Sequence, residues 1–274
     1  MERIKKALDL AREEREGQQR AIAMATTVDS EREQITAPNV ETGIHYSKTK
    51  VIGANHKILQ QNRILVTDEE LDGRTAFKML RTQVLQRMVA KGWNALAITS
   101  PAPGDGKTIV AANLAISLAR ELHHTVLLVD LDLRNPSLHK YFGLNLQHGI
   151  GDYLLSEAPL SDILVNPGIE RLVILPGRNP IENSSELLAS PQMGQLVKEL
   201  KSRYPSRFVL FDLPPILSAD DALAFAPYID ATLLVLREKK TSRQELEQAM
   251  DVLRDVTVLG TVLNASTERV SSYY

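Results

Sequence analysis

The sequence predicts a doubly wound α/β domain over residues 68–266, with a mostly parallel sheet and helices on both of its faces. The first observation behind this prediction is that short runs of apolar residues alternate with segments of helical periodicity. Hydrophobicity in these runs is continuous rather than alternating, which indicates strands that are covered on both faces. The second observation is that glycines, a lysine and aspartates directly follow three of the runs, at the sheet edge where α/β folds bind ligands.

The expected elements follow one another regularly along the chain. A helix is predicted from about Asp68 to Ala90, with its apolar residues on one face. The predicted strands are Ala95–Ile98, Val126–Val129, Leu172–Leu175, Phe208–Phe211, Leu233–Leu236 and Val258–Leu263. The helices predicted between them are Ile109–Arg120, Glu186–Arg203 and Ser242–Arg254. Strands that alternate with helices in this way predict parallel pairing.

The segments on either side of this domain have a different character. Residues 1–67 are predicted to form an arm, in which residues 2–24 have helical spacing and residues 25–65 read as a polar linker or extended segment. The helix at the start is either a solvated terminal helix or a docking helix for a partner. Residues 267–274 are predicted to form a short flexible tail that ends in two tyrosines.

The composition is that of a soluble globular chain, with 274 residues of which 43% are hydrophobic and 24% are charged. A formal net charge of -2 provides no basic field that would attract nucleic acid or anionic lipid. The absence of cysteine excludes disulfides, thiolate metal sites and a cysteine nucleophile, and fits a cytosolic protein. We expect no signal peptide, since the first residues are charged throughout and include no apolar core, and no membrane span, since no apolar run reaches about 18 residues.

The segment Ser100-Pro-Ala-Pro-Gly-Asp-Gly-Lys-Thr108 follows the first predicted strand and opens a helix. Glycines in such a loop allow backbone N–H groups to approach a phosphate, and the helix N-terminus adds a favourable dipole. The loop predicts a nucleotide site of the P-loop NTPase type, although proline stands at residue 101, where the G-x-x-x-x-G-K-T pattern has its first glycine. The residues expected to contact the nucleotide here are Pro103, Gly104, Asp105, Gly106, Lys107, Thr108 and Ile109.

Aspartates follow two further predicted strands. Asp130 and Asp132 come at the end of Val126–Val129 and are expected to point to one side of an extended chain, while Asp212 follows Phe208–Phe211. Neighbouring carboxylates repel one another unless a cation lies between them, so Mg²⁺ is the expected occupant. We expect Thr108, Asp130 and Asp212 to serve the metal, and Asn264, at the end of the last strand, to read the adenine.

Together these motifs resemble those of the bacterial tyrosine kinases (BY-kinases), the autokinases of capsule and exopolysaccharide export. The resemblance covers residues 68–274 and includes Leu175-Pro-Gly, Ser185-Glu-Leu-Leu188 and Gly260-Thr-Val-Leu-Asn264. Its most specific element is the Asp-x-Asp-x-Arg sequence from Asp130 to Arg134. The arm is similar to that of cytoplasmic exopolysaccharide autokinases, including those of exosortase loci, that pair with a separate membrane protein.

The resemblance implies an ATP- and Mg²⁺-dependent protein-tyrosine autokinase that regulates exopolysaccharide polymerisation and export. Lys107 would bind phosphates, and one carboxylate of the pair Asp130 and Asp132 would accept the proton of a tyrosine hydroxyl, whose pKa is near ~10. The expected acceptors are Tyr273 and Tyr274, phosphorylated in trans between copies of the chain.

The implied partners are a membrane polysaccharide co-polymerase that acts as activator, a protein-tyrosine phosphatase and further copies of the chain. Nucleic acid is not expected to bind. The resemblance places the protein in the cytoplasm, held at the inner face of the cell membrane through its partner. The family's ring-assembly motif, Glu-x-x-Arg-x-x-Arg, is degenerate here, because Thr75 and Lys78 replace its first two members and Arg81 alone remains.

Two alternatives share the fold and the aspartates. A partitioning-type ATPase of the Min/Par kind carries a signature lysine early in the loop, where this chain has Ala102 and Pro103. A non-kinase, nucleotide-binding regulator of polysaccharide chain length would keep the loop and the aspartates but would not need the tail tyrosines.

Overall fold

The computed structural model describes residues 49–66, 71–155, 158–204 and 206–267. The predicted helix over residues 2–24, most of the predicted linker and the tyrosines of the tail lie outside these ranges. None of the helices in the described ranges is long and apolar enough to cross a bilayer.

The domain is built on one eight-stranded sheet with the order β1-β4-β5-β3-β6-β2-β7-β8. All neighbouring strands are parallel except the antiparallel pair β4 and β5. The strands are β1 (Lys50–Val51), β2 (Ala95–Thr99), β3 (Thr125–Asp130), β4 (Val165–Asn166), β5 (Leu172–Leu175), β6 (Arg207–Asp212), β7 (Ala231–Arg237) and β8 (Val258–Asn264). The six predicted strands are confirmed, and the two additional strands have only two residues each.

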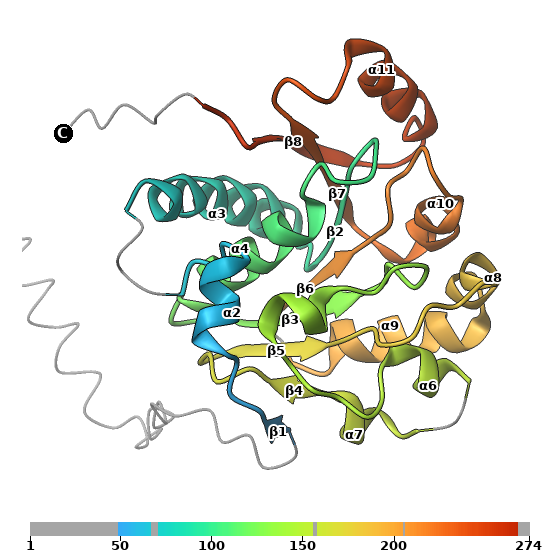
Figure 1. Ribbon diagram of the computed structural model, residues 1–274. Coiled ribbons are helices and arrows are strands. Elements are labelled where there is room, and N and C mark those ends of the chain that lie inside the picture. The colour runs from blue at the N-terminus through green and yellow to red at the C-terminus, as the bar shows by residue number, and fades with distance from the viewer. Residues whose placement is uncertain (1–48, 67–70, 156–157, 205, 268–274) are drawn as a thin grey trace, which may run out of the picture. The chain divides into compact units, whose positions relative to one another are not determined.

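Helices cover both faces of the sheet, as Figure 1 shows. One face carries α2 (His56–Gln61), α3 (Leu71–Lys91), α4 (Lys107–Ala119) and α5 (Leu138–Phe142). The other face carries α6 (Ile150–Leu154), α7 (Leu160–Ile163), α8 (Ser184–Leu188), α9 (Pro191–Ser202), α10 (Asp221–Phe225) and α11 (Arg243–Val252). The short 3-10 helix η1 (Ala226–Tyr228) follows α10.

The two apolar cores lie on opposite faces because strand side chains alternate. In β2, Leu96 and Ile98 pack with α3 and α4, whereas Ala95 and Ala97 pack with α9 and α11. All four side chains are fully buried. The unbroken apolar run thus serves two separate helix layers, which confirms the doubly wound arrangement predicted from the sequence.

The helix predicted over residues 186–203 is divided into two helices. Ser190 caps α9 by accepting a hydrogen bond from the N–H of Met193 at 3.2 Å, and Pro191 is the first residue of the helix. Proline has no N–H to donate and fixes the backbone at the start of a helix, so it ends the preceding helix and starts a new one.

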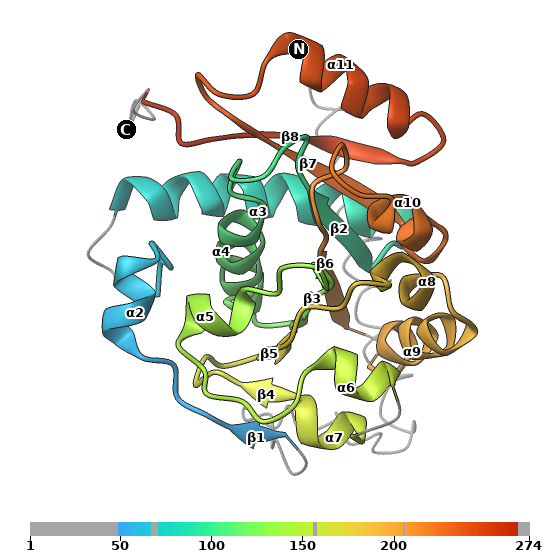
Figure 2. The same ribbon diagram turned by 45° about the vertical axis from the view of Figure 1, so that its right-hand side comes forward.

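Part of the predicted arm belongs to the domain, and the expected boundary at residue 68 is too late. β1 pairs with β4, and Leu59 of α2 is buried against the α4 and α5 side of the core (Figure 2). Side chains then fix the segment that leads to α3. Asn113 of α4 accepts a hydrogen bond from the N–H of Leu65 at 2.8 Å and donates one to the carbonyl of Arg63 at 3.0 Å. The backbone of this segment is thus held by a side chain of α4, and the segment is not a free linker.

Strands β2, β3 and β6 end side by side at the carboxyl edge of the sheet. Asp212 is in register with Asp130 of β3 and with Ile98 of β2. The loop that follows β2 therefore opens beside the two aspartates, although the three segments are far apart in the sequence.

Candidate active site

The loop between β2 and α4 has a backbone shape that a glycine makes possible. Gly104 and Gly106 adopt positive φ angles of 80° and 93°, a region that favours glycine. Gly106 is also the N-cap of α4 and provides no side chain to cap it. The first N–H groups of this helix are consequently directed at the space in front of the loop.

The loop's carbonyl groups are turned away from that space. The carbonyls of Ser100 and Pro101 accept hydrogen bonds from the N–H groups of Ile216 at 2.8 Å and Leu217 at 3.3 Å. The carbonyl of Ala102 accepts one from the hydroxyl of Ser100 at 2.9 Å. Within the described residues, the N–H groups from Gly104 to Gly106 have no hydrogen-bond acceptor. Unpaired N–H groups in a loop before a helix form an anion-binding site.

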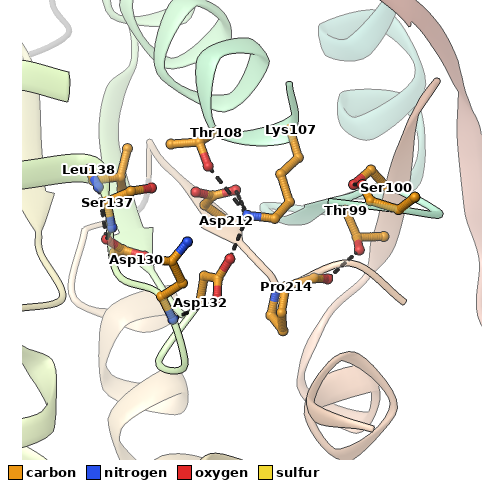
Figure 3. A network of polar contacts seen from close by, with 12 residues as sticks. Thr99, Ser100, Lys107, Thr108, Asp130, Asp132, Ser137, Leu138, Asp212 and Pro214 are labelled. Carbon is orange, nitrogen blue, oxygen red and sulfur yellow. Dashed lines mark hydrogen bonds and ion pairs between the residues drawn. The ribbon is translucent and has the colours of Figure 1, made fainter. Parts of the chain in front are cut away.

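Lys107, the first residue of α4, lies among carboxylates. Its Nζ is 2.7 Å from Oδ2 of Asp132 and 3.8 Å from Oδ1 of Asp212, and it lies 3.4 Å from the hydroxyl of Thr108 (Figure 3). Burial opposes the charge of the ammonium, but Asp212, Asp132 and Asp130 outweigh this effect and raise the pKa of Lys107 above its usual value. The lysine stays protonated and provides a cation at the mouth of the loop.

Asp130 and Asp132 do not point to one side of a strand, contrary to the expectation. β3 ends at Asp130, and Asp132 lies in the turn that follows. Oδ2 of Asp130 accepts hydrogen bonds at 3.0 Å from the N–H groups of Ser137 and Leu138, whereas Asp132 contacts Lys107 (Figure 3). The two carboxylates therefore have different surroundings, since Asp130 faces the backbone that leads into α5 and Asp132 faces the phosphate loop.

Asp130 and Asp212 are buried carboxylates with few hydrogen bonds. Burial, followed by the charge of Asp212, raises the pKa of Asp130 to about 7. Burial also raises the pKa of Asp212 to about 6, although Lys107 and Thr108 act in the opposite direction. Oδ1 of Asp130 and both carboxylate oxygens of Asp212 have no hydrogen-bond partner among the described residues. Such groups are costly to bury unless a cation is provided.

These unpaired oxygens and the Thr108 hydroxyl suit a hard cation such as Mg²⁺. The described ranges contain no group of three or more His, Cys, Asp or Glu residues arranged to hold a metal. Mg²⁺ in phosphate sites is held through one or two protein oxygens together with water and substrate phosphates, so a sparse set of ligands is expected. Thr108, Asp212 and the unpaired Oδ1 of Asp130 are the groups that would hold the ion, which would neutralise phosphate charge.

A pocket of about 730 Å³ opens in front of the loop. Of the residues predicted to contact a nucleotide, Pro103, Gly104, Gly106, Lys107, Thr108, Ile109 and Asn264 line it. Asp105 does not line the pocket, because its side chain is fully buried and Oδ2 accepts a hydrogen bond from the N–H of Ala102 at 3.1 Å. Asp132 lines the pocket, whereas Asp130 and Asp212 lie behind its wall.

Arg134, the last residue of the Asp-x-Asp-x-Arg motif, has two acidic partners that were not predicted from the sequence. Its Nε lies 2.9 Å from the fully buried Asp221, and its Nη2 lies 3.4 Å from Asp220. The pair of adjacent aspartates that follows β6 in the sequence is a signal from which an acidic partner for Arg134 could be predicted. Arg63 and Tyr141, which also line the pocket, come from segments without a recognisable motif.

Comparisons with known proteins identify the family of this chain. A family model described as an AAA domain matches residues 94–263. Tyrosine-protein kinase YwqD of Bacillus subtilis is 30% identical over 79% of this chain and 91% of its own length. Tyrosine-protein kinase wzc of Salmonella typhimurium is 31% identical over 79% of this chain, but the match spans only 30% of that longer protein. The chain belongs to the bacterial tyrosine-protein kinase family.

Solved structures of bacterial tyrosine kinase domains are also similar to this chain. The kinase domain of the Escherichia coli tyrosine kinase ETK is matched with a TM-score of 0.69 and 29% identity, over 82% of this chain and 91% of that chain. The septum site-determining protein MinD from Pyrococcus horikoshii, solved with Mg-ADP, is matched less fully, with a TM-score of 0.53, 27% identity and coverage of 65% and 73%. The fold is thus that of P-loop nucleotide-binding proteins, and the kinase domains match more of it.

Proposed function

We propose that this protein is an ATP- and Mg²⁺-dependent protein-tyrosine autokinase that regulates exopolysaccharide polymerisation and export. The observation that carries the proposal is the position of Lys107, at the mouth of an anion-binding loop and in contact with Asp132 and Asp212. Membership of the bacterial tyrosine-protein kinase family supports the choice of tyrosine as acceptor. Phosphoryl transfer depends mainly on positioning and on neutralising charge, which this arrangement supplies.

The residues take distinct roles in the proposal. Lys107 and the loop N–H groups bind the β- and γ-phosphates, while Thr108, Asp130 and Asp212 hold Mg²⁺. The proton of the tyrosine hydroxyl passes to a carboxylate of the pair Asp130 and Asp132. Asp132 is the one that lines the pocket, and Asp130 is the one whose pKa, at about 7, matches a general base at neutral pH. Single Asp-to-Asn changes at the two positions, followed by pH–rate profiles, separate these roles.

The proposed acceptors are Tyr273 and Tyr274, which lie outside the described residues. A phosphate adds about -1.5 to -2 charge to each tyrosine, and the acidic site would then repel the tail. Phosphorylation in trans predicts a rate that rises more than linearly with protein concentration. A Tyr273→Phe/Tyr274→Phe double variant should keep ATP binding and lose most of its autophosphorylation; full phosphotyrosine in this variant would place the acceptor elsewhere.

Assembly and partners follow the family resemblance. We infer activation by a membrane polysaccharide co-polymerase, reversal by a protein-tyrosine phosphatase, and a cytoplasmic location at the membrane through the partner. In the degenerate ring-assembly motif, Arg81 pairs with Glu121 at 2.9 Å and donates to the carbonyl of Ser117 at 3.2 Å within the same chain. Homo-oligomers are therefore expected to use contacts other than the one that this arginine would make.

The test is mass spectrometry of the purified protein after incubation with ATP and Mg²⁺. Phosphotyrosine that is absent from a folded Lys107→Met variant supports the autokinase. Release of inorganic phosphate without phosphotyrosine contradicts it and favours a non-kinase ATPase or nucleotide-dependent regulator. A partitioning-type mechanism is disfavoured, because Ala102 and Pro103 stand where its signature lysine would be.

A further inference from the structure

Three consecutive carbonyls of the phosphate loop accept hydrogen bonds from side chains that lie near the end of the sequence but are carried by the neighbouring strands β7 and β8 and by the turn after β7. The carbonyl of Pro103 accepts from Nζ of Lys240, and that of Gly104 accepts from Nη1 of Arg237 at 2.8 Å. The carbonyl of Asp105 accepts from Nδ2 of Asn264 at 2.8 Å. The donors lie 133 to 159 residues away in the sequence, at the carboxyl ends of β7 and β8 and in the turn after β7.

We propose that Arg237, Lys240 and Asn264 are positioning residues that hold the phosphate loop in its anion-binding conformation. This inference rests on the proposed nucleotide binding and assigns Asn264 a role other than reading adenine. A backbone segment that presents its N–H groups to an anion must turn its carbonyls the other way. Each donor keeps one carbonyl turned outward, and two of the three donors are cations that also offset the partial negative charge of the carbonyls.

The glycines of the loop provide the space for two of these donors. A Cβ atom at Gly106 would lie 2.0 Å from Nδ2 of Asn264, and one at Gly104 would lie 2.9 Å from Nζ of Lys240. Both distances are shorter than any ordinary contact. Gly106 thus requires glycine for two reasons, the positive φ angle and the close approach of the short Asn264 side chain. Gly104 requires glycine for its positive φ angle, since the flexible end of Lys240 could move away from a Cβ atom.

Lys240 has a second contact that stiffens the loop. Its Nζ lies 3.4 Å from Oδ1 of Asp105, and this fully buried carboxylate also accepts the N–H of Ala102 through Oδ2. The buried Asp105 carboxylate therefore binds the backbone of the loop, and the half-exposed Lys240 binds both that carboxylate and the carbonyl of Pro103. This bracing compensates for a loop in which Pro101 replaces the first glycine of the usual pattern and Pro103 has no N–H to offer.

The test measures binding of two probes, Mg·ADP and magnesium tripolyphosphate, by isothermal titration calorimetry. Arg237→Met and Lys240→Met should each weaken both probes by about tenfold, because the defect lies in the phosphate loop that the probes share. Lys240→Arg keeps a cationic donor and should restore most of the affinity. Asn264→Ala should weaken tripolyphosphate as well as ADP.

Matched controls remove the same charge from the same region. Lys239→Met and Arg243→Met change side chains that pair with Glu238 and Glu247 and do not touch the loop, so both probes should bind as they do to the unchanged protein. Hydrogen exchange without ligand adds a readout that does not depend on binding. Amides of residues 104–107 should exchange faster in the Arg237 and Lys240 variants than in the two controls.

Three outcomes would overturn the inference. Loss of ADP binding with unchanged tripolyphosphate binding would show that Arg237 and Asn264 contact the adenine or ribose instead. Equal losses in the variants and the controls would indicate only a general effect of charge. Variants that bind both probes normally would show that the loop holds its shape unaided. Failure of the unchanged protein to bind either probe would instead contradict the proposed function, and the inference with it.

Discussion

Asp212 and Asp230 lie at opposite edges of the same sheet and have opposite environments. Asp212 ends β6 at the carboxyl edge, is fully buried, and has no hydrogen bond to its carboxylate among the described residues. Asp230 precedes β7 at the amino edge, where it accepts from the N–H groups of Asn94 at 2.9 Å and Ala95 at 2.8 Å and pairs with Lys201 at 2.7 Å.

The pKa values of the two carboxyl groups follow this difference. Burial raises the pKa of Asp212 to about 6. Burial has the same tendency at Asp230, but Lys201 and the two N–H groups outweigh it and hold the pKa of Asp230 below its usual value. One aspartate therefore stabilises the fold, while the other is kept in a costly state that suits a ligand site.

The largest expected effect is a loss of kinase activity when Lys107, the partner of Asp212, is replaced, and no such loss when Lys201, the partner of Asp230, is replaced. Lys107→Met should lower autophosphorylation by roughly 100-fold or more, because it removes the cation that faces the phosphates. Lys201→Met, at the other edge, should leave the activity unchanged and lower only the stability. Phosphotyrosine blotting and thermal melting of both variants give the comparison. Normal phosphotyrosine in a folded Lys107→Met variant would contradict the assignment of the loop.

Asp212→Asn should weaken nucleotide binding in the presence of Mg²⁺ by about tenfold or more, since the residue acts through the metal. Binding without Mg²⁺ should change little. The free energy of unfolding should change by less than about 1 kcal/mol, because the change removes a buried carboxylate that has no hydrogen bond but also removes its weak ion pair with Lys107. Calorimetry with and without Mg²⁺ measures the first effect and urea unfolding the second. Equal losses of affinity under both conditions would indicate a structural role.

Asp230→Ala should lower the free energy of unfolding by about 1–3 kcal/mol, because it leaves Lys201 and two backbone N–H groups without their acceptor. Nucleotide binding should be retained, since the amino edge does not line the pocket. Asp251→Ala is the matched control. Its carboxylate is 79% exposed and lies 3.7 Å from Arg254, so its loss should cost less than about 0.5 kcal/mol. A similar loss of unfolding free energy in Asp230→Ala and Asp251→Ala would contradict a stabilising role for Asp230 at the amino edge of the sheet.

The smallest effect is a difference in pH dependence. The pKa of Asp230 is lower in the folded than in the unfolded state, so its stabilisation is present above the usual value of 3.8 and is lost as the pH falls through the folded pKa. The pKa of Asp212 is raised, so the folded state holds the extra proton and stability falls as the pH rises from 3.8 to about 6. Asp230→Asn should reduce the loss of stability that occurs as the pH falls below 3.8. Asp212→Asn should reduce the loss of stability that occurs as the pH rises from 3.8 to about 6. Urea midpoints measured from pH 3 to 7 check both slopes, and unchanged slopes would contradict the assigned environments.

Local patterns in the sequence were sufficient for the strands and the phosphate loop. Six strands were predicted because each carries several apolar residues, and β2, β3, β5 and β6 are buried on both faces as expected. The edge strand β8 is only partly covered, and its Leu263 is 58% exposed. β1 and β4 were not predicted, since two residues hold no periodicity. The segment that contains α2 was read as a linker because its polar residues give no local sign of the hydrogen bonds that Asn113 makes with it.

The sequence by itself determined the doubly wound fold and the residue types of the site, since apolar runs and a glycine-rich loop are encoded by neighbouring residues. Only the tertiary structure decided that Asp132, rather than Asp130, contacts Lys107, and that Arg237, Lys240 and Asn264 bind the loop carbonyls. Those contacts join segments 25 to 159 residues apart. Their partners are set by the order and register of the strands, which bring distant carboxyl ends to one edge, and no pattern of adjacent residues records that order.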